Sequence, residues 1–347
     1  MQYSKGVQVL SGRTIRTLIT LGLVIALWVL FALTTEYFVS ARNTFQLLKE
    51  SAYVGLIASG MCFAIVSGGV DLSAGGIVCV AGIICARFSF TGAPGVVVVL
   101  VGLLAGAALG FCNSLYITKL HLPPFVATLA ASYIYLGLGL ILAFRANGGI
   151  IARGLTNKSY LLVGKNVGNF YWIIVVWAVA AAILFFVMET TKFATHLYAI
   201  GSNEKSAKMS GVNADRTKSI GYIICGACCG LAATMQVSFQ GSASTQLGKG
   251  YEFQAIAACV VGGCVLGGGK GDQIGTFLGA VFMTMILNGL NKYGMNASWQ
   301  YVVQGVIIVV ATAFDSFFNN LMSKRIEKRS MKRDMLKKGL TVDGGAQ

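Results

Sequence analysis

The segment Gly68-Gly69-Val70-Asp71-Leu72-Ser73-Ala74-Gly75-Gly76 lies between two apolar runs that are each long enough to cross a bilayer. It holds the only acidic residue between Glu50 and Glu189. An aspartate beside hydrocarbon costs roughly 2.5–3.5 kcal/mol, so Asp71 should have hydrogen-bond partners. We expect its carboxylate to accept bonds from the amides of the following turn, as an Asx turn or a helix N-cap. The surrounding glycines would allow neighbouring helices to approach closely.

The composition is that of a polytopic membrane protein. Of the 347 residues, 56% are hydrophobic and only 11% are charged, and the mean hydropathy is +0.73. Apolar windows occupy most of the sequence and leave no room for a soluble catalytic domain. We therefore predict an all-α membrane protein that is driven, if at all, by chemistry on another chain.

Windows of about 20 apolar residues, separated by glycine-containing or charged breaks, predict about ten transmembrane helices. They lie near residues 17–38, 48–67, 74–90, 95–118, 124–145, 170–189, 218–238, 253–267, 273–291 and 298–318. The predicted organisation is a cytoplasmic N-terminus (1–16), a transmembrane domain (17–320) and a basic cytoplasmic tail (321–347). An even number of spans puts both termini on the same side of the membrane.

The net charge of +15 agrees with this topology. Basic residues cluster at both ends of the chain, as the positive-inside rule expects of cytoplasmic ends, so nucleic-acid binding is not needed to explain the charge. One loop departs from the rule. Residues 146–169, which the ten-span order places outside, carry Arg153, Lys158 and Lys165.

The sequence carries no motif of a common enzyme site. Its two histidines, His121 and His196, lie in separate loops, and neither an HExxH nor a GxSxG motif is present. The nine cysteines fall mostly within or at the edges of apolar runs. Cys225 and Cys228 form a CxxC that we interpret as small residues at a helix interface. We predict neither an enzyme nor a metal site.

A second glycine-rich segment, residues 262–271, shares the frame GGxxLxxG with residues 68–75. The two halves of a transporter often echo each other in this way. A phosphate-binding P-loop would need glycine at Cys264 and serine or threonine at Gly271, so we interpret the segment as a turn between packed helices. Gating or structural roles are predicted for Gly68, Gly69, Asp71, Ser73, Gly262, Gly263, Gly268 and Gly271.

The cytoplasmic segment of residues 196–216 predicts a short exposed helix. Asn203 is a suitable N-cap, Glu204 complements the positive helix end and Gly211 is a suitable stop. A helix of about two turns buries little by itself, so it either lies on the membrane surface or docks into a cytoplasmic partner. Its mixture of small, apolar and basic residues suits a protein groove at least as well as lipid.

Polar side chains inside or at the ends of the predicted spans need hydrogen bonds, so they either bridge helices or line a hydrophilic route. A neutral hydroxylated solute could exchange its bonds to water for bonds to such groups without any fixed charge. The pathway candidates are Asn113, Phe125, Thr128, Glu252, Asn288, Asn291 and Gln304.

Four segments together resemble the permease subunits of ribose-type (simple-sugar) importers that are powered by ATP-binding cassettes. They are residues 60–76, 122–129 (LPPFVATL), 198–212 (YAIGSNEKSAKMSGV) and 248–275, continuing to Asn288-Gly289-Leu290-Asn291. They occur in the family's order across nearly the entire membrane region. The chain departs from the family at Phe253 and Gln254, where many relatives have leucine and then an acidic residue, and at Leu136, where arginine is frequent.

The resemblance implies a permease of the bacterial inner membrane, surrounded by lipid, that works as a homodimer or with a related chain. Cytoplasmic ATPase subunits would hold ATP and Mg, an external binding protein would deliver a monosaccharide, and the permease itself would hold no cofactor. The implied ATPase-coupling residues are Gly201, Ser202, Asn203, Glu204, Lys205, Ala207 and Gly211. The departures leave the solute open, so the alternatives are a nucleoside importer of the same superfamily, a facilitator or carrier without a motor, and a structural scaffold.

Overall fold

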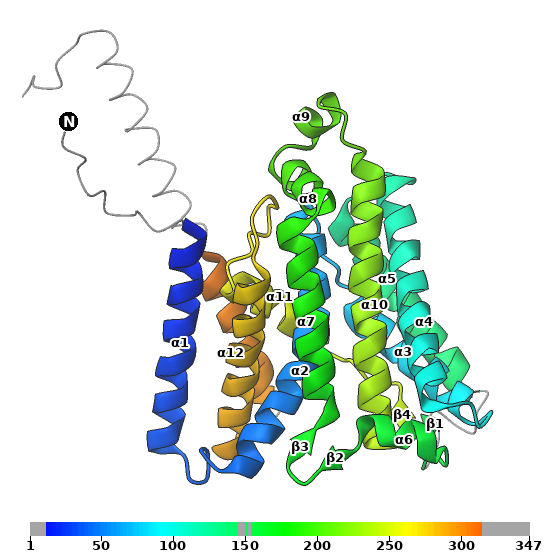
Figure 1. Ribbon diagram of the computed structural model, residues 1–347, viewed down its shortest axis with the longest axis vertical. Coiled ribbons are helices and arrows are strands. Elements are labelled where there is room, and N and C mark those ends of the chain that lie inside the picture. Colours follow the sequence, from blue (N-terminus) through cyan, green and yellow to red (C-terminus); the bar gives the residue numbers. More distant parts are fainter. Residues whose placement is uncertain (1–11, 145–149, 152–153, 297, 314–347) are drawn as a thin grey trace, which may run out of the picture.

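The computed structural model describes residues 12–144, 150–151, 154–296 and 298–313, and these residues are almost entirely helical (Figure 1). The predicted basic tail, residues 321–347, lies outside the described residues, as does most of the predicted N-terminal segment 1–16. The all-α fold class is confirmed. The strands are limited to two ribbons with two residues in each strand.

Every predicted span corresponds to a helix in the structure. These helices are α1 (Gly12–Thr34), α2 (Ala41–Val66), α3 (Ala74–Ser89), α4 (Gly95–Thr118), α5 (Pro124–Phe144), α7 (Trp172–Thr190), α10 (Ala214–Gln240), α11 (Tyr251–Val261), α12 (Gln273–Lys292) and the unlabelled helix Ser298–Ala313. Seven of them are long and apolar enough to cross a bilayer, whereas α3, α11 and Ser298–Ala313 are shorter.

The α11 helix ends earlier than its apolar run predicts. The run suggested a helix to residue 267, but α11 stops at Val261 because Gly262 and Gly263 follow it. Gly263 has a φ of 94°, which an α-helix does not allow. The segment 242–250, which precedes α11, packs on α3 through Gly82 and Gly248. Irregular backbone at membrane depth is tolerated where protein covers it in this way.

The α2 helix forms the centre of the bundle. In its most apolar window 94% of the residues are buried, against 11% in α1 and 17% in α7, so these two helices lie at the periphery. The α2 helix packs against α10, α12, α11 and α7. A polar residue on α2 therefore faces other helices and not lipid.

Glycines bring α4 and α10 into direct contact. Gly102, Gly106 and Gly110 of α4 face Gly226 and Gly230 of α10. A β-carbon at Gly106, Gly110, Gly226 or Gly230 would overlap the backbone of the other helix, and one at Gly102 would overlap the side chain of Thr234. The four-residue spacing of the three α4 glycines thus serves helix packing. The cysteines behave similarly. All nine are free, and Cys225 and Cys228 lie against Gly60 of α2, as expected of small residues at an interface.

The two ends of the bundle differ in structure (Figure 1). One end carries α8 (Lys192–Ser202) and α9 (Glu204–Met209). The other end carries α6 (Lys158–Gly164) and two antiparallel ribbons, β1 (Ile150–Ile151) with β4 (Ala243–Ser244) and β2 (Asn166–Val167) with β3 (Phe170–Tyr171). The described part of the loop 146–169, residues 150–151 and 154–169, therefore lies at the end opposite α9 (Figure 1), as the ten-span topology predicted. The α8 helix was not predicted, since the sequence indicated only one short helix in this region.

Candidate functional site

The α9 helix projects from one end of the molecule (Figure 1). The side chain of Asn203 caps it by accepting a hydrogen bond from the amide of Ser206, at 3.0 Å. Gly211 ends the turn after it with a φ of 85°, a conformation that favours glycine. The short helix, its cap and its stop are thus confirmed where the sequence predicted them.

Most of α9 is open to contact from outside. Ala207 is buried against Ile200 and Ala214, so this small residue seats α9 on α8 and α10. The remaining predicted coupling residues surround it, and Ser202, Asn203, Lys205 and Gly211 are exposed. Met209, at the end of the helix, is 90% exposed. The tip of α9 thus leaves an apolar side chain uncovered.

Glu204 fastens α9 to the start of α10. Its carboxylate lies 2.8 Å from the ammonium of Lys208 and 2.6 Å from that of Lys218. Hydrogen bonds from Lys208 and then Lys218 hold the pKa of Glu204 below its ordinary value. The helix-end role of Glu204 was predicted, but its bond to Lys218 was not. Nothing local in the sequence marks this pair, because it forms only when the chain turns back between α9 and α10.

Beneath α9, three distant segments meet through glycine. Gly201 near the end of α8 lies against Val66 at the end of α2 and against Gly268 and Gly269 of the α11–α12 loop. Gly268 in turn contacts the backbone of Gly68. We call Gly68, Gly201, Gly268 and Gly269 the glycine joint. A β-carbon at Gly201 would overlap the carbonyl oxygen of Val66 and the amide of Gly269.

Hydrogen bonds hold the glycine joint together. The amide of Gly269 donates to the carbonyl of Val66 at 2.9 Å, and the hydroxyl of Tyr198 on α8 donates to the carbonyl of Gly271 at 2.9 Å. Gly68 and Gly268 have φ values of 89° and 86°, so their conformation as well as their contacts favours glycine. The ends of α2 and α8 and the α11–α12 loop are thereby joined backbone to backbone.

The other predicted gating glycines lie around the joint. Gly69 contacts Tyr222 and Pro124, Gly262 contacts Gly275 of α12, Gly263 contacts the side chain of Arg16 on α1, and Gly271 contacts Val66, Cys62 and Cys264. Gly262 and Gly263 thus belong to the packing of α1, α11 and α12. Their gating role stays a prediction.

Asp71 is fully buried and well supplied with hydrogen bonds. Its Oδ1 accepts from the amide and the hydroxyl of Ser73, at 2.9 and 2.6 Å. The side-chain amide of Asn113 on α4 lies 3.3 Å from both carboxylate oxygens and 2.7 Å from the hydroxyl of Ser73. The predicted Asx turn is confirmed, while the N-cap position of α3 belongs to Ser73. This network ties the loop under the glycine joint to α4.

Thr128 and Tyr135 extend the network to α5. The hydroxyl of Thr128 accepts from the amide of Leu72 at 3.1 Å and donates to the carbonyl of Val70 at 3.0 Å. The hydroxyl of Tyr135 donates to the Oδ1 of Asn113 at 2.8 Å. Asn113 and Thr128, two of the pathway candidates, are therefore fully buried as bridging groups in this conformation.

The remaining pathway candidates do not converge on one site. Asn288 exchanges hydrogen bonds with Asn43 of α2 at 3.1 and 3.2 Å, and Asn291 accepts one from Gln300 at 2.6 Å. Phe125 is 60% exposed at the start of α5, Gln304 is buried, and the carboxylate of Glu252 lies against Gly75. Pathway lining by these residues stays a prediction.

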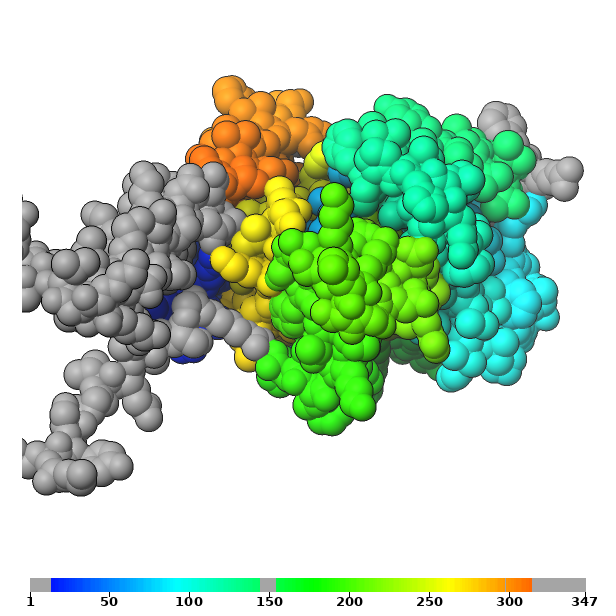
Figure 2. All heavy atoms as spheres, turned by 90° about the horizontal axis from the view of Figure 1, so that it is seen from above, coloured from blue at the N-terminus to red at the C-terminus, as the bar shows by residue number. Residues whose placement is uncertain are grey.

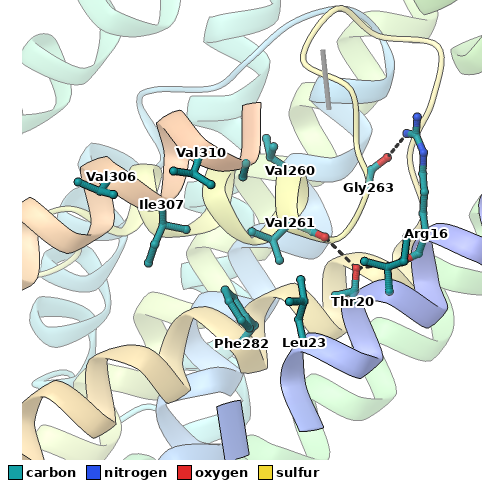
Figure 3. A pocket seen from close by; sticks show the side chains of 12 residues that line it. Arg16, Thr20, Leu23, Val260, Val261, Gly263, Phe282, Val306, Ile307 and Val310 are labelled. Atoms are coloured by element: carbon teal, nitrogen blue, oxygen red, sulfur yellow. Dashed lines mark hydrogen bonds between the residues drawn. The ribbon is translucent and has the colours of Figure 1, made fainter. Parts of the chain in front are cut away.

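An apolar cavity of about 450 Å³ lies between α1, α11, α12 and the helix Ser298–Ala313 (Figure 3). Valine, isoleucine, leucine and phenylalanine side chains form most of its wall. Its polar side chains bond to the protein itself, since Thr20 donates to the carbonyl of Val261 at 2.9 Å and Arg16 to that of Gly263 at 3.2 Å. The cavity does not suit a hydroxylated solute.

The sequence analysis also missed a charged pair inside α2. Lys49 and Glu50 stand at the edge of an apolar run and were interpreted as the start of a helix near residue 48. The α2 helix begins at Ala41, so the pair lies within the helix, and Lys49 is only 4% exposed. The sequence signal for the earlier start of α2 was the stretch 41–47, whose residues are polar but compatible with a helix.

Comparisons with known proteins give consistent matches. The family model described as "Branched-chain amino acid transport system / permease component" matches residues 43–312. A protein named ribose import permease from Bacillus subtilis (strain 168) is 36% identical over 298 residues, covering 85% of this chain and 91% of the relative. The ribose import permease of Escherichia coli (strain K12) is 32% identical over 301 residues (84% and 92%). The galactose/methyl galactoside import permease of Haemophilus influenzae is 34% identical over 314 residues (86% and 91%).

Proposed function

The chain belongs to the branched-chain amino acid transport system / permease component family, and on that premise we propose that it forms the membrane pathway of an ATP-driven sugar importer. It is a transport permease and not itself an enzyme. Several of its helices are long enough to span a bilayer, and it is a multi-pass protein of the bacterial inner membrane. The peripheral helices α1 and α7 would face lipid.

The proposed solute is a small neutral hydroxylated molecule, a monosaccharide. The family's description names amino acids, whereas the relatives that align with more than four fifths of this chain are named for ribose and galactose. We base the proposed solute on the relatives, because 32–36% identity along most of both chains is a closer similarity than membership of a broad family. A nucleoside, which carries a ribose, is the runner-up.

The single observation that carries the proposed mechanism is the attachment of α9 to the glycine joint. The exposed surface of α9 would dock into a groove of a cytoplasmic ATPase subunit, which binds the ATP and Mg that this chain does not hold. The predicted coupling residues, from Gly201 to Gly211, belong to α9, to the end of α8 before it and to the turn after it. An external binding protein would supply the solute.

The joint explains how movement of α9 could reach the membrane. Backbone meets backbone at Gly201, Gly68 and Gly268, so no flexible side chain lies between α8 and the ends of α2 and α11 to absorb a displacement. Packed interfaces of this kind shift between discrete arrangements and do not deform continuously. ATP binding and hydrolysis would shift the population between outward-open and inward-open arrangements.

A second permease chain would complete the pathway. Seen from the α9 end, α5 in teal and the helix Ser298–Ala313 in orange flank a hollow on one side of the molecule (Figure 2). Large apolar side chains on these two helices are exposed, among them Tyr133 at 72% and Val309 at 67%. We propose that a second copy or a related chain covers this side, with the solute passing between the two permeases.

Reconstitution tests the proposal. Vesicles holding this chain should take up labelled D-ribose, D-galactose or D-allose only when the ATPase, the binding protein and ATP are all present. Uptake by the chain alone would establish a facilitator. ATP-driven uptake of adenosine or L-leucine, with none of the sugars, would keep the motor and reject the proposed solute.

A further inference from the structure

An ion pair between a buried lysine and a half-exposed glutamate lies in the outer half of the central helix. The ammonium of Lys49 lies 3.1 Å from the Oε1 of Glu50 and 3.4 Å from the Oε1 of Gln46, all on α2. It also lies 4.1 Å from the ring centre of Phe239 on α10 and 5.1 Å from that of Tyr171 on β3. The pair is neutral overall, and its cation is held against two aromatic rings.

Two buried oxygens, one on α2 a turn beyond Lys49 and one on α10, lack hydrogen bonds within the described residues. They are the hydroxyl of Tyr53, which is 2% exposed, and the Oε1 of Gln236 on α10, which is 9% exposed. The amide nitrogen of the same Gln236 donates to the hydroxyl of Tyr251 on α11 at 2.9 Å. Glu50, Tyr171 and Tyr251 all lie close enough to Tyr53 to interact with it electrostatically.

Unsatisfied buried polar atoms are costly, and a protein that keeps them needs a use for them. Here the hydroxyl of Tyr53 interacts with the carboxylate of Glu50 and with Tyr171 and Tyr251, and Gln236 is bonded to the same Tyr251. A polyhydroxylated ring matches these groups, because each hydroxyl both donates and accepts a hydrogen bond, while the C–H face of the ring packs on aromatic carbon. The neutrality of the Lys49–Glu50 pair favours a solute without charge.

The cluster can be approached from the outer end of the molecule. A groove of about 490 Å³ lies between α6 and the end of α10, and Phe239 forms part of its wall together with Lys158 and Lys165. The side chain of Glu50 is 42% exposed. Phe239 thus lines the groove and also contacts the ammonium of Lys49.

We propose that Lys49, Glu50, Tyr53, Gln236 and Tyr251 form a binding site for a neutral polyhydroxylated solute within a single chain. The site differs from the path between two permease chains and from every pathway candidate that the sequence suggested. Its solute class rests on the proposed function, but its place rests on the geometry alone.

Direct binding to the purified full-length chain tests the site without the ATPase or the binding protein. D-ribose, D-galactose, D-allose and myo-inositol serve as probes, and their binding is followed by saturation-transfer NMR and by the shift in melting temperature. At least one probe should bind saturably. Tyr53→Phe and Gln236→Leu should each weaken that binding about tenfold, the loss expected for one hydrogen bond to a buried group.

Tyr160→Phe is the matched control, since it removes a buried tyrosine hydroxyl that is not one of the five groups of the site and that donates to the carbonyl of Thr234 at 2.7 Å. It should lower the melting temperature and leave probe binding unchanged. Tyr53→Phe should do the reverse, because its hydroxyl makes no bond that the free protein would lose.

The site is overturned if no probe binds the wild-type chain, if Tyr53→Phe binds as the wild type does, or if Tyr53→Phe melts lower than the wild type without probe. If no probe binds the wild-type chain and the reconstituted vesicles take up sugar with ATP all the same, the site is rejected while the proposed function stands. Binding of a probe without any ATP-driven uptake would leave the site standing and reject the proposed function.

Discussion

The two ends of α2 are held in opposite ways. At its inner end, Val66 and Gly68 meet Gly201 and Gly269 with backbone against backbone and no side chain between them. In its outer half, Lys49 and its neighbours present charged, aromatic and amide groups to one another. A contact between backbones can transmit a displacement, whereas a cluster of polar and aromatic side chains can bind a ligand. We infer that α2 connects coupling to the ATPase, at its inner end, with solute binding in its outer half.

The largest effect is expected at the glycine joint. Gly201→Val would place a side chain on the backbone of Val66 and Gly269, which cannot swing aside. Overpacking costs about 1–3 kcal/mol and occasionally more, so the purified variant should melt well below the wild type. Gly22→Ala on α1 is the control, because nothing lies within 4 Å of its β-carbon position. Equal melting temperatures for the two variants would show that the joint is not tight.

The next largest effect concerns the loop beneath the joint, where side chains do hold the structure. Asp71→Leu leaves the amide of Ser73 without an acceptor, at about 1–3 kcal/mol for an unsatisfied buried group, while the amide of Asn113 still donates to the hydroxyl of Ser73. Asp71→Asn keeps one acceptor for Ser73 and should be milder in membrane assembly and melting temperature. Equal losses would show that the charge itself is required.

Docking of the ATPase should depend on the exposed tip of α9. Met209→Asp replaces a side chain that is 90% exposed, so the fold should be unaffected while co-purification of the ATPase falls several-fold. Met295→Asp, at a methionine 42% exposed in the turn after α12, is the matched control and should co-purify normally. If both variants retain the ATPase, α9 is not the docking element.

The smallest effect is expected at the ion pairs of Glu204. Lys208 and Lys218 lower the pKa of Glu204, so its stabilising contribution is present above the ordinary carboxyl pKa and is lost as the pH falls through the lowered one. ATP hydrolysis coupled to uptake should therefore be constant between about pH 6 and 8 as far as this group is concerned.

Glu204→Gln should weaken coupling to a similar degree across that pH range. The pairs are solvent-exposed, so a loss of roughly 0.2–1 kcal/mol is expected in the attachment of α9 to α10. Coupled hydrolysis is measured in vesicles for both proteins. A wild-type protein that uncouples near neutral pH, with the variant unaffected by pH, would assign the Glu204 carboxyl a different role.

Local signals made the helices and the α9 turn predictable from sequence. Apolar runs define the spans, and Asn203 and Gly211 mark a cap and a stop through their own backbone preferences. The α8 helix was missed because its buried face consists of only three spaced residues, Ala194, Leu197 and Ile200, in a segment that reads as a polar loop.

The candidate site was only partly predictable, because it depends on contacts between distant segments. Gating roles were predicted for Gly68 and Gly268 and a coupling role for Gly201. No single segment of the sequence indicates that these three glycines contact one another. The outer cluster was missed for another reason. Lys49 and Glu50 look like a polar helix end, and only the structure shows that α2 begins earlier and that Lys49 is buried.

The central claim is that the glycine joint carries motion from the ATPase to the membrane helices. Its most direct test is the number of ATP molecules hydrolysed per solute molecule imported, measured in the same vesicles for the wild type, Gly201→Ala and the control Gly22→Ala. Gly201→Ala should hydrolyse ATP while importing little solute, so its ratio should rise several-fold, whereas Gly22→Ala should keep the wild-type ratio. An assembled Gly201→Ala transporter with the wild-type ratio would contradict the account.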